Sequence, residues 1–261
     1  MSATAVIRSS AFALLMGVNA VALAQATKES SSSTFTPQVG QEGKDVVWVP
    51  TPQALVNKML DMAHVTAKDY VMDLGSGDGR TVITAAKRGA HATGIEYNPN
   101  MVALSKDNAK KAGVADRAQF LKADLFQTDL SKATVITMFL LPDINLKLRP
   151  KLLALKPGTR VVSNTFTMGD WKPDETGSPD NCDGSWCTAL LWIIPARVAG
   201  SYKTPQGEVT LKQQYQMLSG TLRTEQKTVP VEGRVRGDEV VFNAGGKEYH
   251  GRLNGKALEL N

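Results

Sequence analysis

Three glycines stand at alternate positions in the chain, Gly75, Gly77 and Gly79. The run before them is apolar and β-favouring and carries one acid, Asp73, and the residues from Thr81 onward favour a helix. A strand, a glycine turn and a helix N-terminus form a corner that a ligand can approach closely, because glycine has no side chain and free N–H groups point outward there. The pattern predicts a ligand-binding corner, although a turn without a ligand can have the same local sequence.

Two further acids stand where later strands are predicted to end. Glu96 closes a predicted strand at 91–96, and Asp124, next to Leu125, follows a strand at 118–121. The remaining predicted strands are 70–74, 134–139 and 160–163, with helical patterns between them. Strands that alternate with helices predict an α/β fold with a doubly wound, mostly parallel sheet, which binds ligands at the carboxyl ends of its strands. We therefore expect the three acids to lie at one edge of the sheet.

The spacing of the glycines discriminates between two classes of cofactor. A dinucleotide site has the pattern G-x-G-x-x-G, but the position of the third glycine is Arg80 here. An acid within the first strand and acids after the second and third suit a ligand with an amino-acid moiety, a ribose and an adenine. A carboxylate only accepts hydrogen bonds and can bind two adjacent hydroxyls. These residues favour S-adenosylmethionine over a dinucleotide.

Residues 73–79, Asp-Leu-Gly-Ser-Gly-Asp-Gly, resemble the first motif of the class I S-adenosylmethionine-dependent methyltransferases. The resemblance implies that Asp73 faces the methionine ammonium, directly or through water, and that Glu96 binds the ribose hydroxyls. It implies that Asp124 and Leu125 contact the adenine. The backbone expected to line the cofactor is that of Gly75, Ser76, Gly77 and Gly79.

A narrower resemblance covers about residues 47–172. The segments that carry it are 49–52, 73–80, 96–99, 123–126, 139–142, 147–149 and 158–163. They look like the group that contains the mitochondrial lysine methyltransferases of the ATP synthase c-ring protein and of the adenine nucleotide translocase. The resemblance implies N-methylation of a protein lysine. The N-terminus, the cysteines and the C-terminal residues lie outside it.

The acceptor is expected beyond the end of the fourth predicted strand. Many N-methyltransferases place a polar-Pro-Pro-aromatic motif there, and this chain has Phe-Leu-Leu-Pro-Asp-Ile-Asn at 139–145 instead. Asp143 and Asn145 are candidates for a catalytic role or for a helix cap. The other candidates for the walls of the acceptor pocket, or for packing of the loops, are Pro50, Thr51, Phe139, Pro142 and Trp171.

The chain divides into four predicted parts: a signal peptide (1–24), a flexible lead-in (25–45), the methyltransferase domain (46–199) and a small antiparallel β-rich region (200–261). The last part alternates short apolar runs with glycine turns. Cys182 and Cys187 flank a glycine turn, and in an exported chain such a pair predicts a disulfide, with free thiols as the alternative. No metal site is expected, because zinc would need two more ligands and the three histidines are scattered.

The N-terminus has the features of an export signal. Arg8 precedes an apolar stretch at 11–18, and Ala22 and Ala24 form a small-residue cleavage site before Gln25. The stretch is shorter than the roughly 20 residues that span a bilayer. We expect a cleaved signal and a periplasmic protein. An uncleaved membrane anchor and an organelle presequence are the alternatives.

The composition and charge of the chain limit the classes of partner that it can have. The 261 residues include 42% hydrophobic and 21% charged residues, as in globular proteins, and carry a net charge of +5. The charges are mixed without a basic block, which argues against nucleic acid as a partner. We expect a protein substrate, which could be membrane-associated, and the sequence does not indicate an oligomeric state. The alternative to an enzyme is an exported S-adenosylmethionine-binding or non-catalytic protein that engages a partner through its β-rich end.

Overall fold

The computed structural model describes residues 1–2, 35–182, 184–255 and 257–261. The predicted signal peptide beyond its first two residues, its cleavage site and residues 25–34 lie outside the described residues. In the described part of the chain, no helix has both the length and the apolar character needed to cross a membrane.

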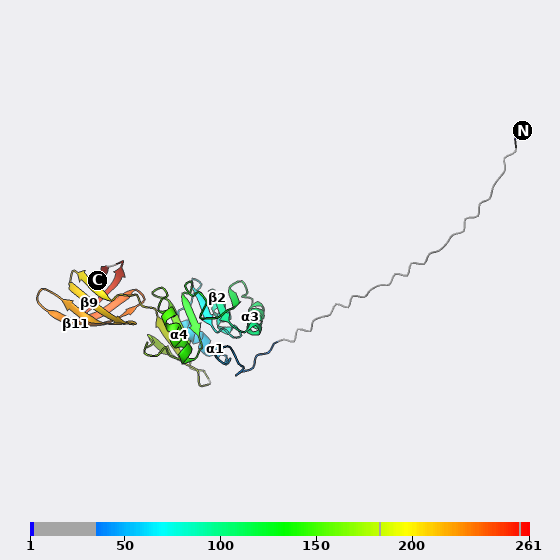
Figure 1. Ribbon diagram of the computed structural model, residues 1–261, viewed down its shortest axis with the longest axis horizontal. Coiled ribbons are helices and arrows are strands. Elements are labelled where there is room, and N and C mark those ends of the chain that lie inside the picture. Colours follow the sequence, from blue (N-terminus) through cyan, green and yellow to red (C-terminus); the bar gives the residue numbers. More distant parts are fainter. Residues whose placement is uncertain (3–34, 183, 256) are drawn as a thin grey trace. The chain divides into compact units, whose positions relative to one another are not determined.

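A seven-stranded sheet forms the first part of the described chain (Figure 1). Its spatial order is β3-β2-β1-β4-β5-β7-β6, in which β1 to β5 are parallel and β7 is antiparallel to both of its neighbours. The bounds are β1 (Tyr70–Leu74), β2 (His91–Glu96), β3 (Ala118–Lys122), β4 (Val135–Met138), β5 (Arg160–Asn164), β6 (Glu175–Gly177) and β7 (Ala189–Ile193). The predicted doubly wound, mostly parallel sheet is confirmed. Its strand order reverses at β1, where a crevice opens between diverging connections.

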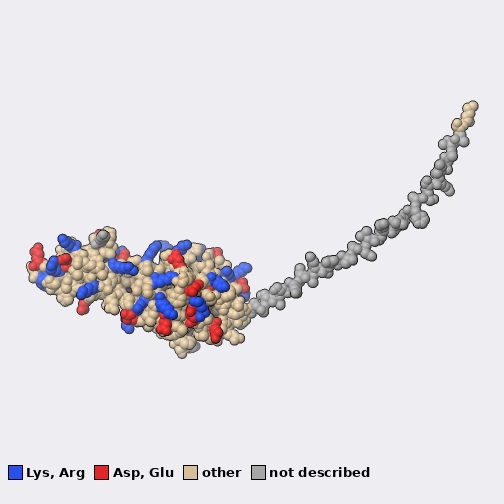
Figure 2. Space-filling view, in the orientation of Figure 1, with Lys and Arg blue, Asp and Glu red and all other residues tan. Residues whose placement is uncertain are grey.

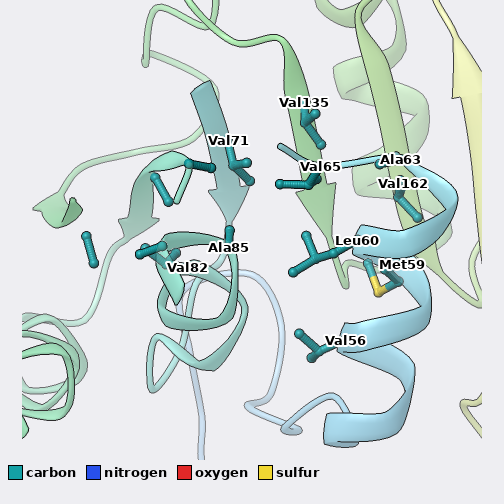
Figure 3. Packing of buried hydrophobic residues seen from close by; sticks show 14 of the residues in the cluster. Val56, Met59, Leu60, Ala63, Val65, Val71, Val82, Ala85, Val135 and Val162 are labelled. Carbon is teal, nitrogen blue, oxygen red and sulfur yellow. The ribbon is translucent and has the colours of Figure 1, made fainter. Parts of the chain in front are cut away.

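Four helices pack on the two faces of this sheet: α1 (Gln53–Met62), α2 (Arg80–Lys87), α3 (Pro99–Lys111) and α4 (Pro142–Leu152). Buried residues of α1, α2 and α3 form one apolar cluster with Val71, Val135 and Val162. Figure 3 shows α1 side chains pointing at these valines. Their neighbours in sequence, such as Met72 and Ile136, belong to a second cluster with α4. This alternation is the period of a strand covered on both faces.

The connection from β5 to β6, residues 165–174, fills the α4 face with an aromatic side chain instead of a helix. Trp171 is fully buried, and its ring centroid lies 6.0 Å from that of Trp192 on β7. The Trp192 indole N–H donates to the Trp171 carbonyl at 2.9 Å. The prediction that Trp171 walls the acceptor pocket is therefore wrong, because its ring packs inside the fold.

The C-terminal part is a second, antiparallel sheet of seven strands in sequence order (Figure 1, yellow to red). The strands are β8 (Gly200–Thr204), β9 (Gly207–Gln214), β10 (Met217–Arg223), β11 (Thr228–Arg236), β12 (Glu239–Ala244), β13 (Lys247–Asn254) and β14 (Ala257–Leu260). The first and last strands approach each other, so the sheet is nearly closed. Its apolar core includes Phe242 and Tyr249, whose rings stack at 5.2 Å. The predicted antiparallel β-rich region is confirmed.

Contacts with the 165–174 connection attach this second sheet. The Tyr215 ring stacks on Trp171 at 5.8 Å, and its hydroxyl donates to Asp170 at 3.0 Å. Arg234 on β11 forms an ion pair of 3.0 Å with Asp174. Residues Phe35–Asn261 accordingly form one compact unit. On the face shown in Figure 2, basic and acidic side chains are interspersed, as the sequence predicts.

Candidate functional site

A cavity of about 520 Å³ lies where the carboxyl ends of β1, β2, β3 and β4 meet. The glycine corner lines it, and so do residues that follow β2, β3 and β4 and the segment 41–51. A cavity of this size is typical of sites for ligands as large as a nucleoside derivative. The predicted site residues that line it are Pro50, Thr51, Asp73, Gly75, Ser76, Gly77, Glu96, Asp124, Leu125 and Phe139.

The glycine corner is a shaped surface without side chains. Gly75 and Gly77 both have left-handed backbone conformations, with φ of +76° and +53°. A Cβ on Gly77 would lie 2.5 Å from Nε1 of Trp48. Gly79 does not line the cavity, because it packs under Phe120, 2.7 Å from where its Cβ would be. A larger residue would not fit at these positions. Gly75 and Gly77 form part of the cavity wall, whereas Gly79 allows the helix and strand to pack closely.

The N–H groups of the corner are occupied, which corrects the expectation that they point outward freely. Those of Gly75 and Ser76 both donate to the carbonyl of Ile95, at 2.9 and 3.1 Å. The Gly77 N–H donates to Glu96, and the hydroxyl of Ser76 is buried without a hydrogen-bond partner among the described residues. Because these N–H groups hydrogen-bond to β2, they are not free for a ligand. The corner presents to a ligand a surface without side chains, its carbonyl groups and one unpaired hydroxyl.

Asp73 is a buried carboxyl at the end of β1. It is 7% exposed, and Oδ1 accepts a 2.6 Å hydrogen bond from the hydroxyl of Thr137 on β4, whose Cα is its register partner. Burial, opposed by that hydrogen bond and reinforced by the charges of Asp78 and Glu96, raises the pKa of Asp73 to about 7. A cation that enters the cavity would therefore meet a carboxyl poised to ionise.

Backbone donors hold Glu96 in one orientation. Its Oε2 accepts from the Gly77 N–H and its Oε1 from the Asn98 N–H, both at 2.9 Å. Asn98 in turn caps α3 by accepting from the N–H of Asn100 at 2.9 Å. Each carboxylate oxygen of Glu96 keeps a further lone pair. The side chain is thus a pre-oriented double acceptor for two neighbouring hydroxyl groups.

Asp124 lies beside a cluster of aromatic rings. Its Oδ1 accepts from the Phe126 N–H at 2.8 Å, and its Oδ2 from the Lys44 ammonium at 3.1 Å. These two hydrogen bonds, the backbone one being the larger cause, hold the pKa of Asp124 below its usual value. The ammonium also lies 5.4 and 5.8 Å from the ring centroids of Tyr97 and Phe126.

Lys44 comes from a segment that was expected to be flexible. The described part of the lead-in forms a turn in which the Trp48 N–H donates to Gln41 and the Gly40 N–H donates to Trp48, both at 2.9 Å. This turn places Trp48 over Gly77 and Lys44 beside Asp124. We call residues 38–50 the lid. In the described part of this segment, the lid hydrogen-bonds to itself and to the cavity.

Aromatic rings wall the end of the cavity beyond β4 and β5. The Phe139 ring stacks on Phe166 at 6.0 Å and lies 6.0 Å from the ring of Trp186. All three residues line the cavity, with Pro50 and Thr51 nearby in the lid and at its end. Pro142 does not line the cavity, since it begins α4. We call Phe139, Phe166 and Trp186 the aromatic wall.

The end of β5 holds the loop of Phe166 in a strained conformation. Thr165 has a φ of +59°, which is uncommon for a β-branched residue. Its N–H donates to the Thr188 carbonyl at 2.7 Å, and the Phe166 N–H donates to the Asn164 carbonyl at 2.6 Å. Strain of this kind persists only where surrounding contacts enforce it, and here the contacts turn Phe166 toward the cavity.

The two catalytic candidates do not reach the cavity. Asn145 is fully buried, and its Nδ2 donates to the carbonyl groups of Phe166 and Thr167 at 3.1 and 3.3 Å. Asp143 is exposed in the first turn of α4. The cap position belongs to Leu141, whose apolar side chain cannot accept a hydrogen bond. Both interpretations are therefore wrong: Asn145 ties α4 to the Phe166 loop, and Asp143 lies on the surface.

Sequence reasoning missed Lys44, Trp48 and Trp186 as cavity residues and Thr137 as the partner of Asp73. A polar residue such as Thr137 in a strand buried on both faces is a usable signal. Trp186 also carried a signal, since it lies between the two cysteines. The predicted disulfide between Cys182 and Cys187 is present. Nothing local indicates that Lys44 and Trp48 return to the cavity.

Acids outnumber bases around the cavity. Six acids and two bases line it: Glu42, Asp45, Asp73, Asp78, Glu96 and Asp124 against Lys44 and Arg80. Both bases are paired, Arg80 with Asp78 at 2.6 Å and Lys44 with Asp124. Such a lining attracts cations. In the described part of the chain, no group of three His, Cys, Asp or Glu residues could hold a metal ion.

The sheet order, the glycine corner and the acids at three strand ends define a class I methyltransferase. The three carboxylate acceptors fit S-adenosylmethionine, since Asp73 can face an ammonium, Glu96 a ribose and Asp124 an exocyclic amine. The backbone at Gly75 and Gly77 carries no side chain of its own, and Trp48 covers it at Gly77.

Comparisons with known proteins agree. The family described as ANTKMT methyltransferase domain matches residues 73–175. A protein-lysine N-methyltransferase of Saccharolobus islandicus (strain REY15A) is 48% identical over 153 residues, which cover 57% of this chain and 94% of that protein. The Mus musculus lysine N-methyltransferase named for the c-ring protein of ATP synthase is 38% identical over 140 residues, 53% of this chain and 56% of the mouse protein.

A solved structure of an RNA methyltransferase from Salinibacter ruber, in complex with S-adenosyl-L-homocysteine, has a TM-score of 0.54. It is 49% identical and covers 57% of this chain and 96% of that chain. The chain belongs to the class I S-adenosylmethionine-dependent methyltransferases, in the family of the Saccharolobus islandicus enzyme. It is an enzyme, and its cofactor is S-adenosylmethionine.

Replacing Lys44 with alanine is expected to strengthen binding of S-adenosylhomocysteine about threefold. The Lys44 ammonium occupies Asp124 and the two rings beside it, so a ligand that uses this place must displace it. The gain is small because the pair is partly exposed, and water and salt screen such pairs. Isothermal titration calorimetry measures the change, with Lys44→Arg as the charge-retaining control. Weaker binding in Lys44→Ala would show that Lys44 contacts the ligand.

Proposed function

We propose that this methyltransferase N-methylates lysine side chains of a protein that it meets outside the cytosol. The observation that carries the lysine assignment is the aromatic wall at the end of an acid-lined cavity. A lysine has an apolar stem that such rings can pack against and an ammonium that their faces attract. The similar enzymes from Saccharolobus islandicus and Mus musculus, which are named for lysine, support the same assignment.

In this proposal, the residues at one end of the cavity bind the cofactor, and those at the other end bind the acceptor. We assign Asp73 to the methionine ammonium, Glu96 to the ribose and Asp124 to the adenine. When bound, S-adenosylmethionine supplies a methyl group activated by a sulfonium. The acceptor can dock as an ammonium against the ring faces, and it can attack only after that proton has passed to water, because only the neutral amine has a free lone pair. With S-adenosylmethionine bound, the chain would align the acceptor amine with the methyl group and exclude water from the site.

Location outside the cytosol rests on two features. The N-terminal residues have the pattern of an export signal, and the disulfide between Cys182 and Cys187 is of the kind that persists in oxidising compartments. A periplasmic protein, free or held by an uncleaved N-terminal segment, satisfies both. Such an enzyme needs a supply of cofactor outside the cytosol.

Two alternatives, an RNA substrate and a non-catalytic role, are less well supported. The Salinibacter ruber relative is described as an RNA methyltransferase, but the cavity here has acids in excess, which would repel phosphates. A non-catalytic role for the β-rich end is not favoured, because the family assignment makes the chain an enzyme.

The test is to incubate the purified protein with S-adenosylmethionine labelled in its methyl group and with fractionated cytosolic, periplasmic and membrane proteins and total RNA. Mass spectrometry then locates the label. We expect methyllysine in periplasmic or membrane proteins, and none with Glu96→Ala as the inactive control. Label in RNA would overturn the lysine assignment. Label confined to cytosolic proteins would overturn the location.

A further inference from the structure

The loop closed by the disulfide carries an unusually placed tryptophan. Trp186 is 41% exposed, yet it lines the cavity and contacts Phe139, with 6.0 Å between the ring centroids and a tilt of 57°. Together with Phe139 and Phe166 it forms a contiguous aromatic surface at the cavity, and contiguous exposed apolar surface marks binding sites. Trp186 lies in the connection between β6 and β7, which are the two strands beyond β5 in the sheet.

The disulfide determines where this side chain stands. Cys182 packs against the apolar cluster under α1 and α2, so one end of the loop is fixed to the core. Cys187, next to Trp186, is bonded to Cys182 with 5.9 Å between the Cα atoms. The carbonyl of the following residue, Thr188, accepts a hydrogen bond of 2.7 Å from the Thr165 N–H. Without the bond, residues 184–187 would be held only by the anchors at Cys182 and Thr188, and the span between them could move Trp186 away from Phe139.

We propose that Trp186 forms the outer side of the acceptor-lysine pocket and that the Cys182–Cys187 disulfide is the device that positions it. Binding of the acceptor, but not of the cofactor, is then weaker in the reduced enzyme. This inference rests on the proposed lysine N-methyltransferase function. Trp186 packs against the lysine stem and attracts its ammonium, and Phe139 and Phe166 complete the wall.

The cofactor end of the cavity is independent of the loop. Asp73 takes its hydrogen bond from Thr137, and Glu96 takes its bonds from backbone N–H groups at residues 77 and 98. Asp124 is held by Phe126 and Lys44. All of these partners belong to the lid, to β4 or to the connections after β1 to β3. Reduction of the disulfide should therefore leave cofactor affinity unchanged while it disorders one side of the acceptor pocket.

The experiment compares Trp186→Ala, Trp186→Phe and the double variant Cys182→Ser/Cys187→Ser with the wild type. Steady-state methylation of N-acetyl-lysine N-methylamide, the smallest probe that carries the acceptor amine and stem, gives KM and kcat. Calorimetry with S-adenosylhomocysteine measures the cofactor end. Met217→Ala is the matched control, because Met217 is an exposed apolar residue on β10.

We expect KM for the probe to rise about tenfold in Trp186→Ala and in the double variant, with affinity for S-adenosylhomocysteine within twofold of wild type. Trp186→Phe and Met217→Ala should stay within about threefold for both. Dithiothreitol should raise KM in the wild type and leave the double variant unchanged. Methylation by Trp186→Ala with a normal KM would overturn this inference alone. A wild type that binds S-adenosylhomocysteine but methylates no lysine, in the probe or in proteins, would overturn the proposed function and this inference with it.

Discussion

Replacing Glu96 with alanine is expected to weaken S-adenosylhomocysteine binding about 100-fold. The carboxylate is held by two backbone N–H groups at 2.9 Å and presents its remaining lone pairs as a pair of acceptors. Hydrogen bonds to a charged group contribute about 1.5–3 kcal/mol each, and water recovers part of the loss. A net loss of about 2.7 kcal/mol corresponds to the factor of 100. Calorimetry measures the dissociation constant directly.

Two controls separate a binding effect from a folding effect. Glu96→Gln keeps one acceptor oxygen, so its loss of affinity should lie between those of wild type and Glu96→Ala. The thermal unfolding midpoint of each variant without ligand shows whether the glycine corner survives. Near-normal affinity in a folded Glu96→Ala would mean that this carboxylate does not bind the ribose.

Acidification is expected to weaken cofactor binding below pH 7 by up to about tenfold per pH unit. Burial raises the pKa of Asp73 to about 7, so the carboxyl takes up a proton as the pH falls through that value. A ligand ammonium near Asp73 selects the ionised form, and the ammonium itself stays charged below pH 7. Calorimetry with S-adenosylhomocysteine between pH 5.5 and 7.5 tests this. Asp73→Asn should bind weakly with a flat pH profile over that range.

The same group has an opposite effect on the stability of the ligand-free protein. Its folded-state pKa of about 7 exceeds the ordinary value of 3.8, so the folded state binds a proton that the unfolded state releases. The contribution of Asp73 to the free energy of unfolding therefore falls as pH rises from about 4 to 7, and it stays low above 7. Asp73→Asn should raise the melting temperature relative to wild type at pH 8 and not at pH 4. A uniform shift at both values would argue against a raised pKa.

The part of the site that could be predicted from the sequence is the part encoded within single strands and the turns that follow them. Asp73, Glu96 and Asp124 each lie in or just after a run of strand-forming residues, and parallel pairing brings the ends of such strands together. The rule needs only element types and their order. The same rule extends to the fold class, because the alternation of strands and helices is itself a local pattern.

What could not be predicted depends on contacts between segments far apart in the chain. The local sequence suggests that Trp171 is a pocket aromatic, but its burial is decided by Trp192 and Tyr215. Trp186 has the local sequence of a loop residue, and its position depends on the Cys182–Cys187 disulfide and on contact with Phe139. The N–H groups of the glycine corner look free in the linear sequence, because the carbonyl that accepts them comes from β2.

Trp48 bears on the rate of ligand entry as well as on the shape of the site. Its indole nitrogen stands 2.5 Å from the point that a Cβ on Gly77 would occupy, directly over the corner that the cofactor must reach. We expect a ligand that reaches the Gly77 backbone to displace the indole first, so that entry takes two steps, opening and docking. At high ligand concentration, the rate of ligand entry is then limited by the rate at which the lid opens. We expect product release to depend on the same residue, which precedes the sheet.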